Sequence, residues 1–263
     1  MDLGIRGRVA LVGASGRGLG LATAMRLAAE GCNVAVCDLD PDVLDGAVEK
    51  VKAEGEGIEV RGYQVDLTDP DAIDRVVASV REDLGPIGIL INNSEGPPPG
   101  GFDAATDEKW YRAYDLTFMS AVRMTRAVLP DMKEQGWGRI INFTSRAIRE
   151  PIPNLMLSNA VRLAVAGMAK TLASEVAEFG ITVNNLGPGP TTTDRSVQLA
   201  RAGAEKKGIS VEEELKQKAK NIPIGRLATP DEQAAVATFL ASEPAGYITG
   251  VSLVVDGGAV KAL

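Results

Sequence analysis

Seven short runs of apolar residues recur along the chain, and longer segments with helical spacing of apolar positions separate them. Runs that are apolar at successive positions are typical of strands buried on both faces, and intervening helices are typical of crossovers in a parallel sheet. The pattern predicts a single doubly wound α/β Rossmann domain over residues 1–263, with helices on both faces of a seven-stranded parallel sheet. The expected strands are Val9–Val12, Val34–Cys37, Val60–Val65, Ile87–Ile91, Ile140–Phe143, Ile181–Val183 and Ser252–Val255.

Two segments interrupt this alternation. Residues 96–101 contain three consecutive prolines between glycines, a composition that continues neither a helix nor a central strand. Residues 191–222 insert a charged helical stretch before the last expected helix. We expect this insertion to be a substrate lid or, alternatively, an oligomer-contact or solvent-exposed hairpin, because its charged runs are solvated in either arrangement.

Composition narrows the class of protein. The chain has 263 residues, 45% of them hydrophobic, and a net charge of −7, so it can bury a large core and carries no basic run for a nucleic acid or an anionic membrane. The amino terminus lacks the apolar region of a signal peptide, and no apolar run approaches about 18 residues, the length of a spanning helix. We therefore expect a cytoplasmic protein whose partner is a small-molecule substrate.

The residues available for chemistry are restricted. The sequence has no histidine, which excludes histidine-based triads, Cys-His dyads and the common zinc sites, and no metal site is predicted. Its two cysteines, Cys32 and Cys37, lie five residues apart along one predicted strand. We expect reduced, partly buried thiols without a catalytic role.

A glycine-rich turn follows the first expected strand and leads directly into a helix. Residues Gly13–Gly20 supply the flexible backbone that approaches a pyrophosphate, and the helix start offers unpaired N–H groups to it. Asp38 closes the second strand twenty residues after Gly18, where a carboxylate accepts hydrogen bonds from adenosine ribose hydroxyls. The combination predicts a dinucleotide site, and a purely structural tight turn is the alternative.

These motifs resemble the classical short-chain dehydrogenase/reductase family over essentially the whole chain. The family pattern Thr-Gly-x-x-x-Gly-x-Gly aligns with Gly13–Gly20, with Gly13 in place of Thr and Ala14 in place of the first Gly. Other matches are the adenine-contacting pair at 66–67, the Asn-Asn-Ala-Gly position at 92–95, the nicotinamide segment at 188–193, and the carboxyl-terminal signature at 247–250 and 256–258. The resemblance implies cofactor contacts from Gly13, Ser15, Arg17, Gly18, Leu19, Asp38, Asp66, Leu67, Asn93, Arg162, Pro188, Thr191 and Thr193.

Two residues give opposite indications about the cofactor. Asp38 repels a 2′-phosphate and favours NAD, whereas Arg17 is of the type that family members use to hold NADP. A phosphate placed beside a carboxylate costs on the order of 1 to 4 kcal/mol at a surface-like dielectric, while an arginine can swing away. We therefore expect NAD to be preferred, with NADP as the alternative.

The family's catalytic positions hold unusual residues. Ser145, at the end of the fifth strand, matches the serine that binds the carbonyl oxygen. Ser158 stands thirteen residues later, at the position of the proton-transferring tyrosine, and Arg162 stands four residues beyond it, at the position of the lysine. Gly167 and the run 170–175 support this register, and Thr117 takes the place of the family's asparagine. The resemblance thus assigns catalytic positions to Ser145, Ser158 and Arg162.

These replacements change the expected chemistry. A serine hydroxyl is a far weaker acid than a phenol, whose pKa is about 10, and a guanidinium does not deprotonate to relay a proton. Ser158 and Arg162 still share one helical face. Arg162 can therefore bind a cofactor ribose or a substrate anion, while Ser158 donates one neutral hydrogen bond.

Three interpretations remain open. In the first, the protein is a redox enzyme acting on a carbonyl or secondary alcohol, and water, the substrate or another residue moves the proton. Glu95 is the candidate residue for this transfer, although an exposed loop carboxylate is the favoured interpretation of that position. The second is non-redox elimination, hydration or lyase chemistry. The halohydrin dehalogenases, relatives with arginine in place of the lysine, eliminate an anion, but they keep the tyrosine and lose the glycine turn, the reverse of this chain. The third is a catalytically silent nucleotide-binding protein. We favour the redox enzyme, since a complete hydride-carrier site including Thr193 has no evident use in the other two.

The surroundings of the site are only partly defined. Tyr114, in the helix before Thr117, is expected at a subunit contact and not in catalysis. The resemblance implies a homotetramer built by the long helices of residues 103–135 and 155–178 and by the last strand. The loops and the 191–222 insertion are expected to line the substrate pocket and to bring Arg146, Arg149 and Arg195 to it.

Overall fold

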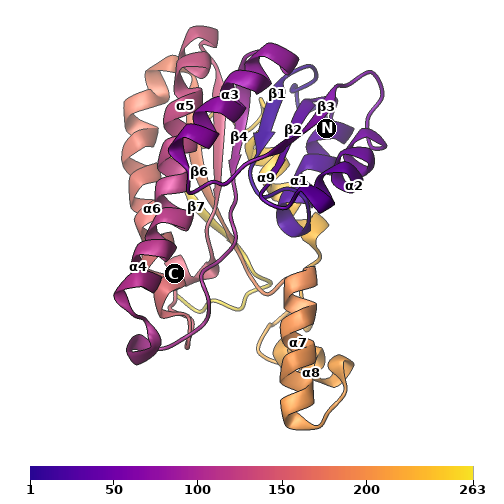
Figure 1. Ribbon diagram of the computed structural model, residues 1–263, viewed down its shortest axis with the longest axis vertical. Coiled ribbons are helices and arrows are strands. Elements are labelled where there is room, and N and C mark those ends of the chain that lie inside the picture. The colour runs from indigo at the N-terminus through magenta and orange to yellow at the C-terminus, as the bar shows by residue number, and fades with distance from the viewer. Residues whose placement is uncertain (263) are drawn as a thin grey trace.

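One parallel sheet organises the molecule (Figure 1). The structure, a computed structural model, describes residues 1–262, except for the side chains of residues 195, 199, 202 and 206. Its described strands form a seven-stranded sheet of order β3-β2-β1-β4-β5-β6-β7, in which every pair is parallel. The predicted fold class and all seven predicted strands are confirmed. The bounds are β1 (Val9–Val12), β2 (Asn33–Asp38), β3 (Val60–Gln64), β4 (Ile87–Asn92), β5 (Gly138–Phe143), β6 (Ile181–Pro188) and β7 (Ser252–Val255).

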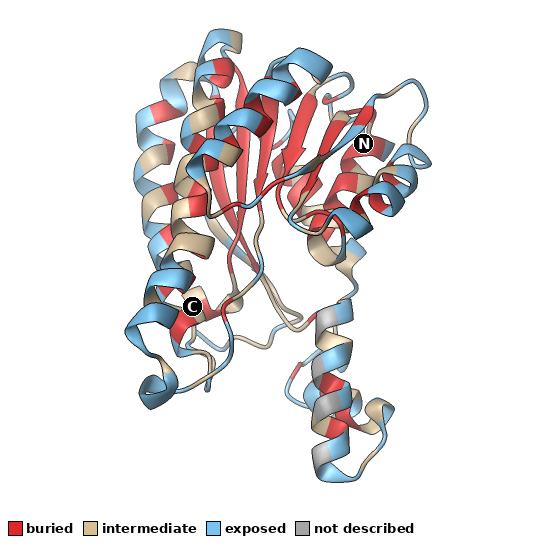
Figure 2. Ribbon diagram, in the orientation of Figure 1, coloured by how far each residue is buried: buried red, intermediate tan, exposed pale blue. Residues whose placement is uncertain are grey.

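Helices cover both faces of the sheet, and the central strands between them are buried (Figure 2). The apolar side chains of β1, β4 and β5 point alternately into two cores, one beneath each layer of helices. Leu27 belongs to the first core and Val128 to the second. The first core packs against α1 (Gly18–Ala29), α2 (Pro41–Lys52) and α9 (Pro230–Leu240), and the second against α3 (Pro70–Leu84), α5 (Ser120–Gln135) and α6 (Met156–Val176).

Burial explains why the strands read as continuous apolar runs. Every residue of β4 and β5 is buried, so neither face of these central strands selects for polar side chains. The edge strand β3 differs, because only Val60 is buried there. The hydrophobic pattern is therefore sharpest in the middle of the sheet.

Polar side chains also form a buried row across the sheet. The Nδ2 atom of Asn92 donates to Oδ1 of Asn142 at 2.8 Å, and Nδ2 of Asn142 donates to Oδ1 of Asn185 at 3.0 Å. Asn185 in turn donates to Oγ of Ser252 at 3.1 Å. These four residues are register partners on β4, β5, β6 and β7, so the NH2 group of each asparagine replaces the water it loses on burial with a hydrogen bond to the next strand.

The strand order places a crevice at one end of the sheet. The chain moves outward from β1 through β2 to β3, then returns to β4 beside β1 and continues in the opposite direction. In such open sheets the crevice at this reversal, beyond the carboxyl ends of the strands, is the usual ligand site. The glycine turn after β1 and the loop after β4 both end there.

The predicted insertion forms a helical hairpin that projects from the rest of the molecule (Figure 1). Its helices are α7 (Asp194–Lys207) and α8 (Val211–Ala219). Buried alanines pack between them, and Nζ of Lys207 lies 2.8 Å from the buried carboxylate of Glu214. The hairpin has its own small interior, and its role as a lid stays a prediction.

Both cysteine thiols are free, as the sequence predicts, although they are fully and not partly buried. Burial raises the pKa of Cys32 to about 12 and raises the pKa of Cys37 as well. Within the described chain, no helix has the length and apolar character needed to cross a membrane.

Candidate dinucleotide and catalytic site

A large cleft opens where the carboxyl ends of the strands meet the glycine turn. It has a volume of about 1140 Å³ and is lined by the turn, the end of β2, the loop after β4 and the start of α7. The cofactor residues predicted from the sequence that line it are Arg17, Gly18, Leu19, Asp38, Asp66, Leu67, Asn93 and Thr193. The structure thus brings eight of the thirteen positions to one surface.

The helix that begins at the turn presents its amino end without a side-chain cap. Arg17 is the N-cap of α1, and its side chain makes no capping hydrogen bond. Such a helix start leaves backbone N–H groups available to an anion and carries the positive end of the helix dipole. The cleft therefore has the donor set that a pyrophosphate requires.

Ser15 fixes the turn from beneath. Its side chain is fully buried, with Oγ donating to the carbonyl oxygen of Val12 at 2.7 Å and accepting from the backbone N–H of Cys37 at 2.9 Å. Ser15 does not line the cleft, so these contacts give it a scaffolding role between β1 and β2. Its predicted contact with the cofactor stays a prediction.

Two positions in the turn have demanding backbone geometry. Ala14 has a φ of 44°, a left-handed conformation that glycine adopts more readily than alanine. A Cβ atom at Gly20 would lie 2.3 Å from the carbonyl oxygen of Ala14, so the helix can approach the turn only with glycine there. Alanine therefore occupies a glycine-like position, while Gly20 is sterically required.

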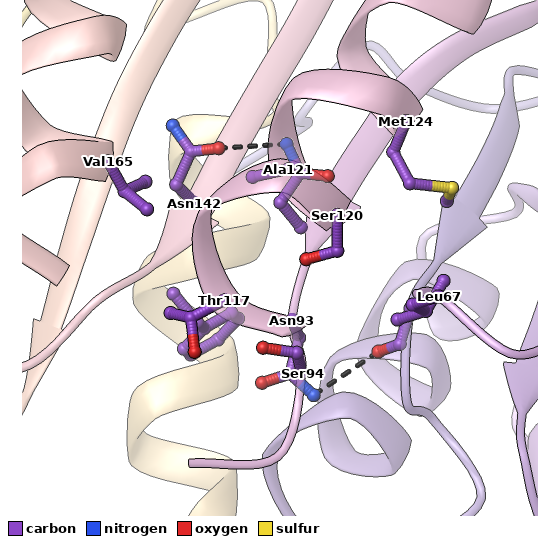
Figure 3. Close-up of a pocket in the computed structure, with 12 residues that line it drawn as sticks. Leu67, Asn93, Ser94, Thr117, Ser120, Ala121, Met124, Asn142 and Val165 are labelled. Atoms are coloured by element: carbon purple, nitrogen blue, oxygen red, sulfur yellow. Dashed lines mark hydrogen bonds between the residues drawn. The ribbon is translucent and has the colours of Figure 1, made fainter. Parts of the chain in front are cut away.

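Asn93 connects the turn to the loop after β4 (Figure 3). Its Nδ2 atom donates to the carbonyl oxygens of Gly13, at 3.2 Å, and Ala14, at 3.1 Å. A Cβ at Gly13 would lie 2.7 Å from the backbone oxygen of Asn93, which accounts for glycine at that position. Loop and turn therefore support each other on either side of the cleft.

Asp38 stands at the end of the cleft where the adenosine ribose is expected. Its Oδ2 accepts from the backbone N–H of Gly16 at 2.9 Å, and its Oδ1 accepts from that of Asp40 at 3.1 Å. Arg17 pairs with Asp40 across 2.7 Å and not with Asp38. The sequence did not predict a place for Asp40 in the cleft, because an Asp-Pro pair is typical of a helix start.

The predicted cofactor residues after β6 differ in their relation to the cleft, which Thr193 lines. Thr193 caps α7, with Oγ1 accepting from the N–H of Ser196 at 3.2 Å, and its side chain approaches Gly18. Pro188 ends β6, and Thr191 is buried, with its hydroxyl donating to the carbonyl oxygen of Gly189 at 3.0 Å. Neither Pro188 nor Thr191 lines the large cleft.

The predicted catalytic residues gather around the end of β5. Ser145 caps a short helical turn, with Oγ accepting from the N–H of Ala147 at 3.1 Å. On α6, Nε of Arg162 donates to Oγ of Ser158 at 3.3 Å, and Nη1 donates to the carbonyl oxygen of Phe143 at 2.8 Å. All three predicted catalytic residues are half-buried, and none lines the large cleft.

Arg162 also approaches the loop after β4. A Cβ atom built on Gly96 would lie 3.5 Å from Nη2 of Arg162. Glu95, the residue before Gly96, is exposed and lines the large cleft together with Tyr111 and Tyr114. Glu95 thus lines the cofactor cleft, and the next residue along the loop adjoins Arg162.

A second, small cavity lies behind the loop (Figure 3). Its volume of about 10 Å³ accommodates roughly one water molecule. A single π-helical turn, Asp115–Met119, joins α4 (Asp107–Tyr114) to α5 and carries Thr117 to the cavity wall. The Oγ1 atom of Thr117 and Oδ1 of Asn92 are buried there without protein hydrogen bonds. π-Turns are frequent at functional sites, but they have no sequence signature.

The other candidates differ in their surroundings, and among those with described side chains only Tyr114 lines the large cleft. Tyr114 is 45% exposed, and its ring centroid lies 5.0 Å from that of Phe118. Arg149 is exposed and Arg146 half-buried, whereas the side chain of Arg195 lies outside the described residues. No group of three or more Cys, Asp or Glu side chains in the described part of the chain is arranged to hold a metal ion.

Comparison with known proteins agrees with this geometry. A family model described as enoyl-(acyl carrier protein) reductase matches residues 13–260. The short-chain reductase protein NovJ of Streptomyces niveus is 35% identical, over 95% of this chain and 93% of its own. The 2,3-dihydro-2,3-dihydroxybenzoate dehydrogenase of Bacillus subtilis is 32% identical, over 97% of each chain.

A solved structure extends the likeness to three dimensions. L-Sorbose reductase from Gluconobacter frateurii, in complex with NADPH and L-sorbose, superposes with a TM-score of 0.96 at 35% identity and full coverage of both chains. The uncapped helix start, the glycine turn and the cleft of this chain fit a nicotinamide dinucleotide of the kind bound there. The chain belongs to the short-chain dehydrogenase/reductase family.

Proposed function

We propose that this protein is an NAD-linked oxidoreductase that interconverts a carbonyl compound and a secondary alcohol. The observation that carries the choice of NAD is the position of Asp38 in the cleft, with its carboxylate fixed by the N–H groups of Gly16 and Asp40. A carboxylate held there accepts hydrogen bonds from ribose hydroxyls and repels a 2′-phosphate. The alternative cofactor is NADP.

We further propose a non-standard catalytic site in which Ser158 and Arg162 occupy the tyrosine and lysine positions. The Oγ atom of Ser158 accepts from Arg162, which leaves the serine O–H group to donate to a substrate oxygen. Ser145, at the neighbouring end of β5, supplies a second hydroxyl. The two serines orient the carbonyl and stabilise negative charge on its oxygen.

Arg162 positions the serine and does not relay a proton. Its guanidinium is anchored by the carbonyl oxygen of Phe143 and remains charged at any working pH. When bound, the nicotinamide supplies or accepts the hydride. The proton then passes to or from water, the substrate or Glu95, which is the exposed carboxylate of the cleft beside Gly96.

The chain around this site is proposed to be one domain over residues 1–263, with residues 191–222 acting as a lid over the substrate. Thr193, at the base of the hairpin, lies against Gly18 of the cofactor turn, so movement of the hairpin would reach the cleft directly. The proposed homotetramer would cover Leu163 on α6 and Leu253 on β7, which are exposed apolar side chains on the elements assigned to its contacts.

The reaction is tested by incubating the protein with nicotinamide-deuterated NADH and a panel of ketones and aldehydes, and by measuring deuterium in the alcohol product. We expect Ser158→Ala to lower kcat by about 10- to 1000-fold, as for loss of an oxyanion donor, without weakening NADH binding. Glu95→Gln is compared with Glu56→Gln, an exposed glutamate outside the cleft. A wild-type protein that binds NADH but reduces no carbonyl, and oxidises no alcohol in the reverse assay, would favour a non-redox or silent relative.

A further inference from the structure

The ion pair between Arg17 and Asp40 lies at the adenosine end of the cleft. The Nη2 atom of Arg17 is 2.7 Å from Oδ2 of Asp40, and both residues line the cleft together with Asp38. Arginine is the residue best suited to bind a phosphate, because its planar fork matches the phosphate oxygens. In this protein, one nitrogen of that fork is already paired with a carboxylate oxygen.

The carboxylate of Asp40 is held in place by its own helix. Asp40 is the N-cap of α2, and its Oδ1 accepts from the N–H of Asp42 at 3.1 Å. Its backbone N–H donates to Asp38 at 3.1 Å, and Pro41 restricts the first turn of the helix. One carboxylate oxygen is therefore committed to the helix, which directs the other toward Arg17.

We propose that Asp40 is a second determinant of cofactor choice, acting through Arg17 to disfavour a 2′-phosphate. This inference rests on the proposed NAD-linked function. A 2′-phosphate that engaged Arg17 would have to break the pair or bind beside two carboxylates, those of Asp38 and Asp40. NAD carries no such phosphate, so its binding neither breaks the ion pair nor brings a phosphate beside the two carboxylates.

Replacing Asp38 and replacing Asp40 should therefore have different effects on nucleotide binding. Asp38 faces the ribose position itself, so its replacement is expected to change the binding of both nucleotides. Asp40 is engaged with Arg17 and the helix, so its replacement is expected to change NADPH binding alone. The pair is about half exposed on both sides, and solvent screening limits the effect to a modest factor.

The chain provides a closely matched control. Residues 69–71 repeat the Asp-Pro-Asp sequence of residues 40–42, and Asp69 caps α3 by accepting from the N–H of Asp71 at 2.9 Å. Asp69 pairs with Arg75 across 3.6 Å and does not line the cleft. Asp69→Ser therefore makes the same change to the same helix cap, away from Arg17.

The experiment is a fluorescence titration of NADH and NADPH with the wild type, Asp40→Ser, Asp69→Ser, Arg17→Ala and the Asp40→Ser/Arg17→Ala double variant. Serine retains the capping hydrogen bond and removes the charge. We expect Asp40→Ser to lower the Kd of NADPH by about two- to fivefold, as for an exposed ion pair, and to leave that of NADH unchanged. Asp69→Ser is expected to change neither, and the double variant to show no gain over Arg17→Ala.

Three results would overturn the inference. One is an unchanged Kd for NADPH in Asp40→Ser, another is an equal change for both nucleotides, and the third is a gain that persists without Arg17. The proposed function fails separately, if the wild type binds neither nucleotide. Wild-type NADH binding with an unresponsive Asp40→Ser variant would retain the function and reject the role of Asp40.

Discussion

The guanidinium of Arg162 donates through Nη1 to the carbonyl oxygen of Phe143 at 2.8 Å, which ties α6 to the last residue of β5. The same guanidinium donates through Nε to Ser158. One side chain therefore fixes both the position of the helix and the orientation of a candidate catalytic hydroxyl. Ser158 therefore owes its position near the end of β5 to this side chain.

Removing the Arg162 side chain should destabilise the fold as well as the site. Arg162→Ala leaves the buried carbonyl of Phe143 without this donor, which is expected to lower the free energy of unfolding by about 1–3 kcal/mol. Urea denaturation measures this change. Arg126→Ala, at an exposed arginine of α5, is the control and should shift stability by less than about 0.5 kcal/mol. Equal effects of the two substitutions would contradict the anchoring role.

Ala14 offers a stabilising substitution. Its φ of 44° is costly for alanine, so Ala14→Gly is expected to raise the free energy of unfolding by up to about 1 kcal/mol. Asn154, with a φ of 62°, is the comparison, because asparagine tolerates this conformation and Asn154→Gly should gain less. Thermal or urea denaturation of both variants tests the difference, and a loss of stability in Ala14→Gly would contradict it.

Two glycines predict opposite outcomes for the same substitution. In Gly20→Ala the new Cβ would meet the backbone of Ala14 at 2.3 Å, so the turn must distort and nucleotide binding should be lost. In Gly46→Ala, on the exposed face of α2, the Cβ meets nothing within 4 Å. Alanine should there stabilise the helix by roughly 0.5–1 kcal/mol. Melting temperatures and NADH titrations of both variants check this. Normal NADH binding by Gly20→Ala would contradict the assignment of the glycine turn as the pyrophosphate site.

The thiols should be inert in the folded protein. Burial holds the pKa of Cys32 at about 12 and raises that of Cys37, so almost no thiolate is present near neutral pH, and access is blocked. An aromatic disulfide reagent at pH about 8, near the pKa of a free thiol, should label neither residue in the native protein and both in denaturant. Rapid labelling of the native protein would show that β2 opens.

The strands were predictable where burial is complete. β4 and β5 lie between two helical layers, and their apolar residues follow one another directly because neither face meets water. β6 was predicted only to Val183, although it continues to Pro188. Asn184 and Asn185 interrupt its apolar run, and their hydrogen-bond partners lie in segments distant in the sequence.

The site was predictable where its residues act locally. The spacing of Asp38 from the glycine turn reflects one strand–turn–helix unit, so the sequence indicated its place in the cleft. The pairing of Asp40 with Arg17 depends on how α2 packs beside the turn, and the π-turn that carries Thr117 depends on hydrogen bonds without a residue preference. The ion pair and the π-turn could therefore be recognised only from the three-dimensional structure.

The most direct test of the account is a titration of the wild-type protein with NADH and NADPH, followed by fluorescence and by the melting temperature. We predict tighter binding of NADH, with a stabilisation that approaches about 2.7 kcal/mol when the ligand is about 100 times its Kd. Tighter binding of NADPH would contradict the assigned role of Asp38. Binding of neither nucleotide would contradict the assignment of the cleft as a dinucleotide site.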